Sequence, residues 1–222
     1  MLKRQSGFTL IEIAIVLVII GLLLGGVLKG QELITSARVR NMVSQQDGVK
    51  AAYFGFLDRY RALPGDYSAA STNIANVTTT VAACGNGNGN GDGTITTANA
   101  ENILAWEHLS KAGFINGTYS CAGAAATAAS VPTNAYGQFL NLIFDNTFAG
   151  GGANRHNLQT GANVPSDILG EIDRKVDDGN ATTGTFRGSG ANAGAACWST
   201  AAPIGVWTVT NPSTTCGGAT LF

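Results

Sequence analysis

The stretch that decides the fold is Lys3-Arg4-Gln5-Ser6-Gly7-Phe8-Thr9-Leu10-Ile11-Glu12, which leads into an almost purely apolar run. Residues 8–28 are 21 positions filled almost entirely by Ile, Leu, Val, Ala and Gly. A helix of that length, at about 1.5 Å rise per residue, crosses a bilayer core of roughly 30 Å. Glu12 lies inside this run, where a carboxylate costs about 2.5–3.5 kcal/mol to insert. Glu12 is therefore a candidate functional residue that needs a partner, and no Lys or Arg lies within reach on its helix face.

Two simpler interpretations compete for this segment. A secretory signal peptide has a basic start and an apolar stretch, followed by a cleavage site of small residues. No A-x-A-like site follows residues 8–28, and the helical pattern continues instead. The other interpretation is a plain single-span membrane anchor.

The arrangement of Gly7, Phe8 and Glu12 after a short basic leader resembles the precursors of type IV pilins and pseudopilins. In that family a prepilin peptidase cuts after the glycine and methylates the new amino terminus. The resemblance implies cleavage between Gly7 and Phe8 and N-methylation of Phe8. It also implies a partner for Glu12, because the ammonium created at Phe8 can meet the Glu12 carboxylate of a neighbouring subunit. Opposite charges about 4 Å apart attract far more strongly in a low-dielectric filament core than in water, so this pair would set the axial register.

The resemblance implies a structural subunit of a type IV pilus-like filament and not an enzyme. The alternatives are a type II secretion pseudopilin, or a minor pilin that acts as a tip adhesin or binding module. Many major pilins have a proline near the end of the apolar stretch, and the absence of proline from residues 8–63 favours these alternatives. The implied partners are copies of the chain itself, related pilins, prepilin peptidase and the inner-membrane assembly platform.

The charges around the span indicate its orientation in the membrane. Lys3 and Arg4 precede the span, so the leader is expected to stay in the cytoplasm and the residues after Leu28 to be exported. The precursor is therefore expected in the inner membrane with its head in the periplasm. The mature protein would then move into a cell-surface pilus or a periplasmic pseudopilus.

The sequence divides into four segments by composition and pattern: a cleaved leader (1–7), a transmembrane or filament-core helix (8–28), an amphipathic continuation (29–63) and an exported globular head (64–222). Without a proline in residues 8–63, a single helix of about 55 residues is expected. Leu63-Pro64-Gly65-Asp66 should end it, because a residue before proline is disfavoured in a helix and glycine permits a turn. The apolar positions of the continuation recur at steps of three and four: Ile34, Ala37, Met42, Val49, Ala52, Tyr53, Phe56, Leu57 and Tyr60. Arg38, Gln45, Gln46, Lys50 and Arg59 are mostly off this stripe.

The head is rich in Gly, Ala, Asn and Thr and is predicted to be α+β. Ala98–Ala112 and Pro165–Val176 have helical patterns with helix-end signals, while Tyr136–Phe144 and Gly205–Thr210 are strand candidates. Ala122–Ser130 is of low complexity and is expected to be a surface loop. The predicted fold is thus a long N-terminal helix packed on a small, mainly antiparallel sheet with long, disulfide-stapled loops.

The chain has four cysteines, which fit an exported, oxidising setting. None of them has C-x-x-C spacing and the chain has two histidines, which argues against a zinc site. Of the three pairings that four cysteines allow, we choose the nearest-neighbour one, Cys84–Cys121 with Cys197–Cys216. A C-terminal loop closed by a disulfide also resembles the pilins.

One segment of the head has the pattern of an ion site. Asn88, Asn90 and Asp92 have the spacing of the first ligands of an EF-hand loop. The closing glutamate is absent, since Asn99 occupies its place, but Glu101 could substitute for it. Some pseudopilins bind calcium in a comparable region, so weak calcium binding is one hypothesis. A flexible Asn/Gly turn is the other, and no other cofactor is expected.

No catalytic pattern stands out in the head. His108 and His156 have no nucleophile at a known motif spacing, so each is expected to be a surface or hydrogen-bonded residue. Asp173, Asp177 and Asp178 form a weaker acidic group that a helix end and a turn explain. Beyond residue 61 the chain has ten acidic and five basic residues. This charge balance argues against binding to nucleic acid.

Overall fold

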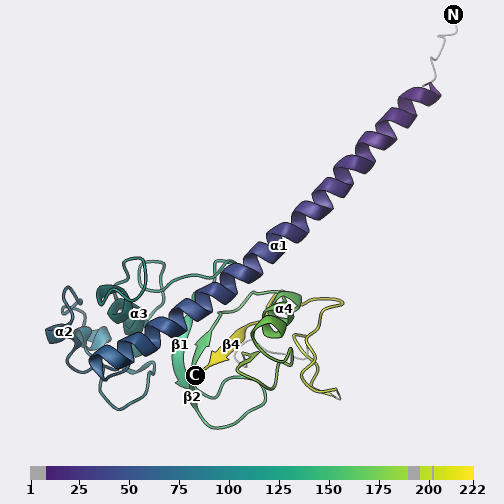
Figure 1. Cartoon of the computed structure of the whole chain (residues 1–222). Helices are drawn as coiled ribbons and strands as arrows, with labels where there is room; N and C mark the ends of the chain where they lie inside the picture. Colours follow the sequence, from purple (N-terminus) through teal and green to yellow (C-terminus); the bar gives the residue numbers. More distant parts are fainter. Residues whose placement is uncertain (1–8, 190–195, 202) are drawn as a thin grey trace, which may run out of the picture. The chain divides into compact units, whose positions relative to one another are not determined.

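The computed structural model describes residues 9–189, 196–201 and 203–222 (Figure 1). Gly7 and Phe8, and with them the expected cleavage site, lie outside the described residues. The chain forms one long helix, α1 (Leu10–Tyr60), followed by short helices, loops and a small sheet. The remaining elements are α2 (Ala70–Asn73), η1 (Ala82–Gly87), η2 (Ala98–Ala100), α3 (Glu101–Lys111), β1 (Asn141–Asp145), β2 (Arg155–Gln159), α4 (Ser166–Val176), β3 (Phe186–Gly188) and β4 (Gly218–Leu221). The predicted α+β class and the long first helix are confirmed.

The chain divides into two compact units, Met1–Arg38 and Val39–Phe222. Within the first unit, α1 is an apolar helix whose side chains are uncovered, with Leu10 88 % and Leu22 73 % exposed. A helix that is apolar on all sides is normally found inside a membrane or a protein core. Among the described residues, α1 is the one helix that is long and apolar enough to cross a membrane.

The sheet of the second unit has four strands in the order β1-β2-β4-β3, all paired antiparallel (Figure 1). Asn141 pairs with Gln159 between β1 and β2, and Gln159 pairs with Ala219 between β2 and β4. Every residue of β4 is buried, as expected for a strand with neighbours on both sides. The predicted antiparallel sheet is therefore confirmed.

The larger part of the core, the α3 cluster, lies between the last turns of α1, α3 and the first two strands. From α1 it takes Val49, Ala52, Tyr53 and Phe56, which recur at the spacing that places them on one helix face. The partners on the other elements are Ile103, Leu104, Trp106 and Leu109 of α3, Leu142 of β1 and Leu158 of β2. The predicted apolar stripe of α1 and the predicted helix at Ala98–Ala112 thus meet in one cluster.

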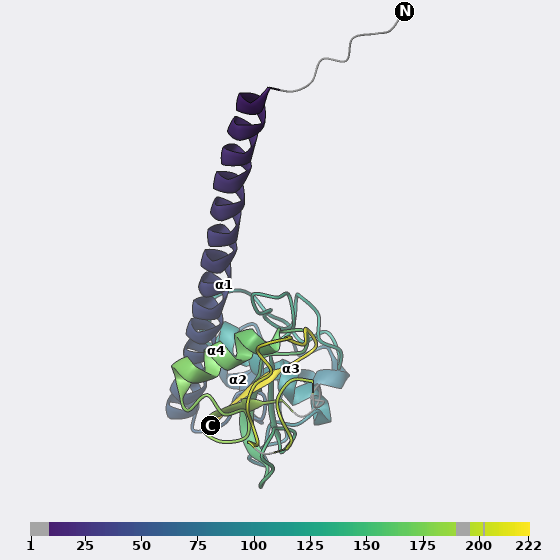
Figure 2. The same ribbon diagram turned by 90° about the vertical axis from the view of Figure 1, so that its right-hand side faces the viewer.

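A second part of the core, the α4 cluster, begins at the first residue of the second unit. Val39 and Met42 of α1 belong to it. Their partners are Ile168, Leu169 and Ile172 of α4, together with Phe186, Trp198 and Trp207. Both views show α4 close to α1 (Figures 1 and 2). The burial of α1 therefore starts at Val39, while Ile34 of the predicted stripe is 55 % exposed.

The end of α1 follows from its local sequence. Arg61 has a positive φ of 54°, and Pro64 and Gly65 then turn the chain. Gly65 has a φ of +89°, and a Cβ at this position would lie 2.3 Å from the Glu101 carbonyl oxygen. Glycine is therefore required where the turn after α1 passes the start of α3.

Gln46 corrects the predicted polar face of α1. It was placed off the apolar stripe, but it is 4 % exposed. Its Oε1 accepts a hydrogen bond from the Thr220 hydroxyl of β4, which satisfies this oxygen inside the head. A polar residue can be buried when it finds such a partner, and hydrophobic periodicity alone does not reveal that partner.

The two head helices are confirmed, at Glu101–Lys111 and Ser166–Val176, and the predicted surface loop has no helix or strand. The strand candidates are confirmed only in part. In the first candidate, Tyr136–Phe144, the strand begins only at Asn141. The residues before it form a turn with a single bridge between Thr133 and Phe139.

The second strand candidate, Gly205–Thr210, is wrong. Val206 and Trp207 make only isolated bridges, to Asn180 and Trp198. These bridges hold a loop inside the second disulfide and do not extend a sheet. Strand β2 was not predicted, because its sequence Arg-His-Asn-Leu-Gln is polar at most positions. Strands β3 and β4 were also missed, because they are short and contain glycine.

Phe56 and Phe54 provide a matched test of the α3 cluster, because they lie on opposite faces of α1. Phe56 is fully buried, and Phe54 is 47 % exposed. We expect Phe56→Ala to lower the free energy of unfolding by about 3–5 kcal/mol, and Phe54→Ala by less than about 1 kcal/mol. Urea unfolding of the full chain in detergent, followed by near-ultraviolet circular dichroism, measures both. Equal losses in the two variants would contradict this packing.

Candidate functional site

Thr9 and Glu12 form a capping box at the start of α1. Glu12 Oε2 accepts hydrogen bonds from the backbone N–H and the hydroxyl of Thr9, both at 2.8 Å. The Glu12 N–H in turn donates to Thr9 Oγ1 at 3.4 Å. These contacts satisfy donors that a helix start otherwise leaves without partners. A Thr three residues before a Glu is the sequence signal for this arrangement, so it could have been predicted from residues 9–12.

The Glu12 carboxylate has no cationic partner within the described part of the chain. The hydrogen bonds that this carboxylate accepts are both donated by Thr9, to Oε2. The ion pair of α1 that lies closest to Glu12 in sequence joins Lys29 and Glu32. Glu12 is exposed, and so are its apolar neighbours Leu10 and Ile11. The capping box orients the carboxylate, and its charge remains available to a group on another chain.

The cysteines of the head form two disulfides, in the pairing chosen from the sequence. Cys84 pairs with Cys121, with their Cα atoms 6.2 Å apart, and Cys197 pairs with Cys216, at 5.7 Å. The four residues are almost fully buried. The first disulfide belongs to the α3 cluster and the second to the α4 cluster, so each one fastens a loop to a different part of the core.

A buried carboxylate organises the Asn/Gly segment. Asp66 Oδ1 accepts the N–H groups of Gly91 at 2.6 Å and Asp92 at 3.0 Å, and Oδ2 accepts that of Gly93 at 2.9 Å. Asp66 is 4 % exposed, so these backbone donors replace the water that the carboxylate loses on burial. Asp66 was not singled out from the sequence, although its place after the Pro-Gly turn fits a residue that begins a loop.

The four predicted calcium ligands belong to the same hydrogen-bonded network. Their oxygens accept backbone N–H groups at 2.8–3.1 Å: Asn88 from Ser71, Asn90 from Asp92, Asp92 from Thr94, and Glu101 from Asn90 and Thr96. A calcium ion would have to share or replace these bonds. Burial raises the pKa of Glu101, and a bound cation would favour its charged form. Calcium binding stays a prediction.

The calcium prediction can be tested by thermal unfolding of the full chain in detergent. For a dissociation constant of about 1 mM, calcium at about 5 mM stabilises the folded state by about 1 kcal/mol. The prediction therefore expects a rise in Tm of a few degrees that magnesium does not reproduce and that Asp92→Ala removes. An unchanged Tm in calcium would leave the segment as an Asn/Gly turn.

Asp173, Asp177 and Asp178 gather at the end of α4, with oxygens within 4.8 Å of one another. Asp173 is fully buried, and its Oδ2 accepts the Trp207 indole N–H at 2.6 Å. Asp177 Oδ2 accepts the Phe186 N–H at 2.9 Å. The group thus joins α4 to β3 and to the loop of the second disulfide, which agrees with a role at a helix end and turn.

Asp173 and Asp177 have pKa values shifted in opposite directions. Burial, and then the hydrogen bond to Asp177, raise the pKa of Asp173 to about 7. Although burial opposes the shift, the hydrogen bond with Asp173, with support from the N–H of Phe186, lowers the pKa of Asp177 to about 2. Between about pH 2 and about pH 7, Asp173 therefore carries the proton and Asp177 the negative charge.

The free energy of unfolding should therefore depend on pH through Asp173. In the unfolded chain an aspartate titrates at about 3.9, whereas folded Asp173 keeps its proton up to about pH 7. Stability from this group should thus fall as the pH rises from about 4 to about 7, by about 1 kcal/mol per pH unit. Asp173→Asn should remove this slope while still accepting the Trp207 N–H. Urea unfolding at several pH values measures the difference, and identical slopes in the two proteins would contradict the assignment.

The histidines have structural roles. His108 is fully buried, its Nδ1 accepts the Gly65 N–H at 3.0 Å, and its Nε2 lies 3.1 Å from the Gly87 carbonyl oxygen. Burial lowers the pKa of His108 to about 4, so the ring is neutral and Nε2 donates. His156 lies on β2, and its ring lies near those of Tyr53 and Phe144, each tilted by 46° to it. His108 is a hydrogen-bonded residue, as expected.

Glu107 is a further buried carboxylate that the sequence did not reveal. It accepts the N–H groups of Thr78 and Cys121, each at 2.7 Å, so it fastens two loops to α3. Within the described part of the chain, Glu107, Asp66 and Asp173 are all engaged in such contacts. These buried acids thus stabilise loops.

Comparison with known proteins bears on the N-terminal segment. The prokaryotic N-terminal methylation motif matches residues 2–28. Comparison with curated proteins gave no match, and comparison with solved structures gave none either. The matched residues include Gly7, Phe8 and Glu12 and the exposed apolar helix, which fit a membrane-anchored precursor and a structural protein. At residues 2–28 the chain therefore carries the signature of type IV pilins and pseudopilins.

Proposed function

We propose that this protein is a structural subunit of a type IV pilus-like filament, assembled through the first part of α1. The observation that carries the proposal is the uncovered apolar surface of α1 within the methylation motif. From Leu10 to Leu28 the large apolar side chains are about half exposed or more. Such a surface has to be covered by lipid, by other helices, or by each in turn.

Neighbouring helices can approach this segment closely. Gly21 and Gly25 are four residues apart and lie on one helix face, and a Cβ at either position would have no atom within 4 Å. Pairs of small residues at this spacing allow close packing of membrane helices. Once helices meet outside lipid, each Å² of buried apolar surface contributes roughly 25 cal/mol to assembly.

Prepilin peptidase cleaves the precursor between Gly7 and Phe8 and methylates Phe8 in this proposal. The new ammonium group of Phe8 then pairs with Glu12 of a neighbouring subunit. The pair offsets the cost of placing Glu12 in an apolar filament core, and it fixes the register because a shift along the axis separates the charges. The head is periplasmic in the precursor, and the inner-membrane platform adds the subunit to the filament.

A pseudopilin or a minor pilin is the second candidate role. The specific observation in its favour is that α1 runs without interruption from Leu10 to Tyr60 and that residues 8–63 contain no proline. Many major pilins have a proline near the end of the apolar stretch. The absence of this proline is consistent with a type II secretion pseudopilin or with a minor pilin at a filament tip.

The role of the Glu12 charge can be separated from its role in the helix cap. Glu12→Gln keeps an acceptor for Thr9 but removes the charge, whereas Thr9→Val removes one capping hydroxyl and keeps the charge. We expect Glu12→Gln to insert into the membrane and to be processed, yet to assemble poorly. The lost attraction is about 1–4 kcal/mol for each subunit contact, which corresponds to a loss of about fivefold to nearly a thousandfold in the association constant.

The yield of filaments sheared from cells, relative to processed subunit in the membrane, measures assembly. Thr9→Val should assemble nearly as well as the unchanged protein, and Glu32→Gln controls for the loss of an acid outside the apolar run. Normal assembly of Glu12→Gln together with failure of Thr9→Val would show that Glu12 acts only as a helix cap.

A further inference from the structure

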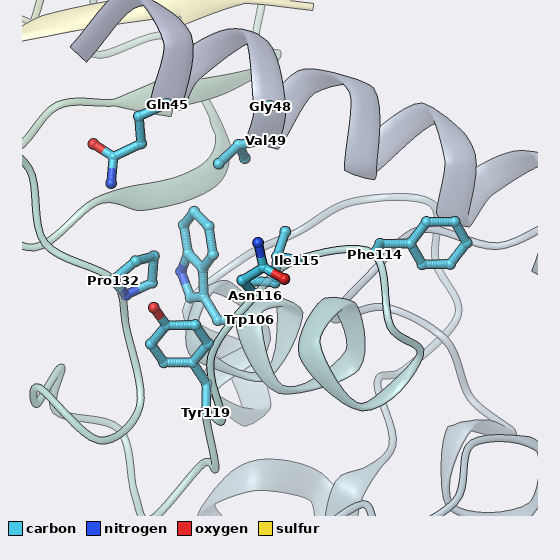
Figure 3. Close-up of a pocket in the computed structure, with 9 residues that line it drawn as sticks. All are labelled: Gln45, Gly48, Val49, Trp106, Phe114, Ile115, Asn116, Tyr119 and Pro132. Atoms are coloured by element: carbon cyan, nitrogen blue, oxygen red, sulfur yellow. The ribbon is translucent and has the colours of Figure 1, made fainter. Parts of the chain in front are cut away.

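A pocket of about 320 Å³ lies within the second unit, between one face of α1, the end of α3 and the loop that follows (Figure 3). Its size is at the lower end of the range for small-molecule sites. Gln45, Gly48 and Val49 of α1 form one wall. The other walls are Trp106, Phe114, Ile115, Asn116, Tyr119 and Pro132. The lining contains no charged side chain, so a ligand of this pocket would be uncharged.

Trp106 is the unusual residue of this pocket. Its side chain is fully buried, and its Nε1 has no hydrogen-bond partner among the described residues. Leaving such a donor unpaired costs about 1–3 kcal/mol. Figure 3 shows the indole nitrogen on the ring edge that faces Pro132 and the Tyr119 hydroxyl, inside the pocket lining. An oxygen of a bound molecule would satisfy this donor.

Two further polar groups of the pocket have no partner within the described part of the chain. They are the hydroxyl of Tyr119, which is half-buried, and the side-chain amide of Asn116, which is exposed. A hydroxyl and an amide can each donate and accept hydrogen bonds. By contrast, the indole of Trp207 is already bonded to Asp173. The pocket therefore combines aromatic walls with several unpaired polar groups, which is the usual composition of a ligand site.

We propose that this pocket binds one uncharged sugar ring. The hydroxyls of a sugar both donate and accept, as the Tyr119 and Asn116 groups do, and a ring hydroxyl or an acetamido carbonyl would accept the Trp106 N–H. The C–H groups of a sugar ring carry a small positive charge and pack against the negative face of an aromatic ring such as that of Tyr119. Tyr119 lies beside the indole nitrogen (Figure 3), so binding includes a shift of its side chain.

A proline-rich peptide is the rival occupant, because such peptides dock in aromatic-lined grooves. Peptide carbonyls accept hydrogen bonds and proline has no N–H, so a proline tract cannot donate to the Asn116 amide oxygen. The sugar matches both the donors and the acceptors of the pocket. The proposal goes beyond the role as a filament subunit, and it can be tested on the detergent-solubilised monomer, where assembly has no influence.

Gly48 allows the pocket to be filled without disturbing the fold. It lies on α1, and a Cβ at this position would have no atom within 4 Å. A larger residue here also favours the helix. Gly48→Leu should therefore fold and occupy the pocket. Asp47 comes directly before Gly48 on α1 and does not line the pocket. Asp47→Leu places a leucine at this position and so serves as the matched control.

The experiment is a titration of the ¹⁵N-labelled full chain in detergent micelles, observed at the indole N–H signals of its three tryptophans. The probes are glucose, galactose, N-acetylglucosamine and N-acetylgalactosamine, with a proline decapeptide as the rival. A ligand of about twelve heavy atoms should bind with a dissociation constant in the millimolar range. At least one sugar should move the Trp106 signal, which Trp106→Phe identifies, and leave the Trp207 signal in place.

The variants then decide where the sugar binds. Gly48→Leu should abolish the shift of the Trp106 signal, and Asp47→Leu should keep it. Trp106→Phe lacks this signal, so its binding is followed at the side-chain amide of Asn116, which lines the same pocket. Binding to this variant should be weaker by up to about tenfold, as expected for the loss of one hydrogen bond. The proposal is overturned if none of the four sugars moves the signal at about 50 mM, well above the expected dissociation constant. It is equally overturned if the proline peptide alone moves the signal, or if Gly48→Leu leaves the shift intact.

Discussion

The structure depends on how the apolar surface of one helix is covered. Between Val39 and Phe56, one apolar face of α1 packs against α3, α4 and the sheet, and this burial forms the core of the second unit. From Leu10 to Leu28, α1 is just as apolar, but nothing in the described chain covers it. In the function we propose, the free energy gained by covering this segment drives membrane insertion and then assembly. Glu12 is the one charged residue of that segment, so the lipid or helices that cover the segment have to stabilise its carboxylate.

The head contains little regular secondary structure and many loops. Its short strands and helices are joined by long segments whose backbone donors need acceptors. Buried carboxylates provide several of these acceptors. Asp66 accepts three backbone N–H groups, Glu107 fastens two loops to α3, and Asp173 with Asp177 joins α4 to the loop of the second disulfide. The disulfides then fasten the same loops covalently. These acids accept backbone N–H groups that a helix or a sheet would otherwise satisfy, and in another protein such buried acids would suggest catalysis.

The sequence predicted those features that depend on local pattern. The long helix, its end near Pro64, and the helices at Glu101–Lys111 and Ser166–Val176 follow from periodicity, capping and turn residues. The features that depend on distant partners could not be predicted in this way. Gln46 is buried because Thr220 reaches it across 174 positions, and Gly218–Leu221 is a strand because it lies between β2 and β3. At the N-terminal site, Gly7, Phe8 and Glu12 were recognised from their spacing, whereas the bond between Thr9 and Glu12 was overlooked. The pocket beside Trp106 left no sequence signal, since its lining comes from three separated segments.

The proposed assembly depends on cleavage at Gly7, which creates the amino terminus that meets Glu12. This cleavage can be tested by mass spectrometry of the N-terminal peptide, from sheared surface material and from membranes in parallel. We expect a peptide that begins at Phe8 and carries one added methyl group. Abundance in sheared fibres would identify a surface pilin, and confinement to membranes would identify a pseudopilin or a scarce minor subunit. A peptide in which Gly7 is still joined to Phe8 in both fractions would rule out the proposed assembly.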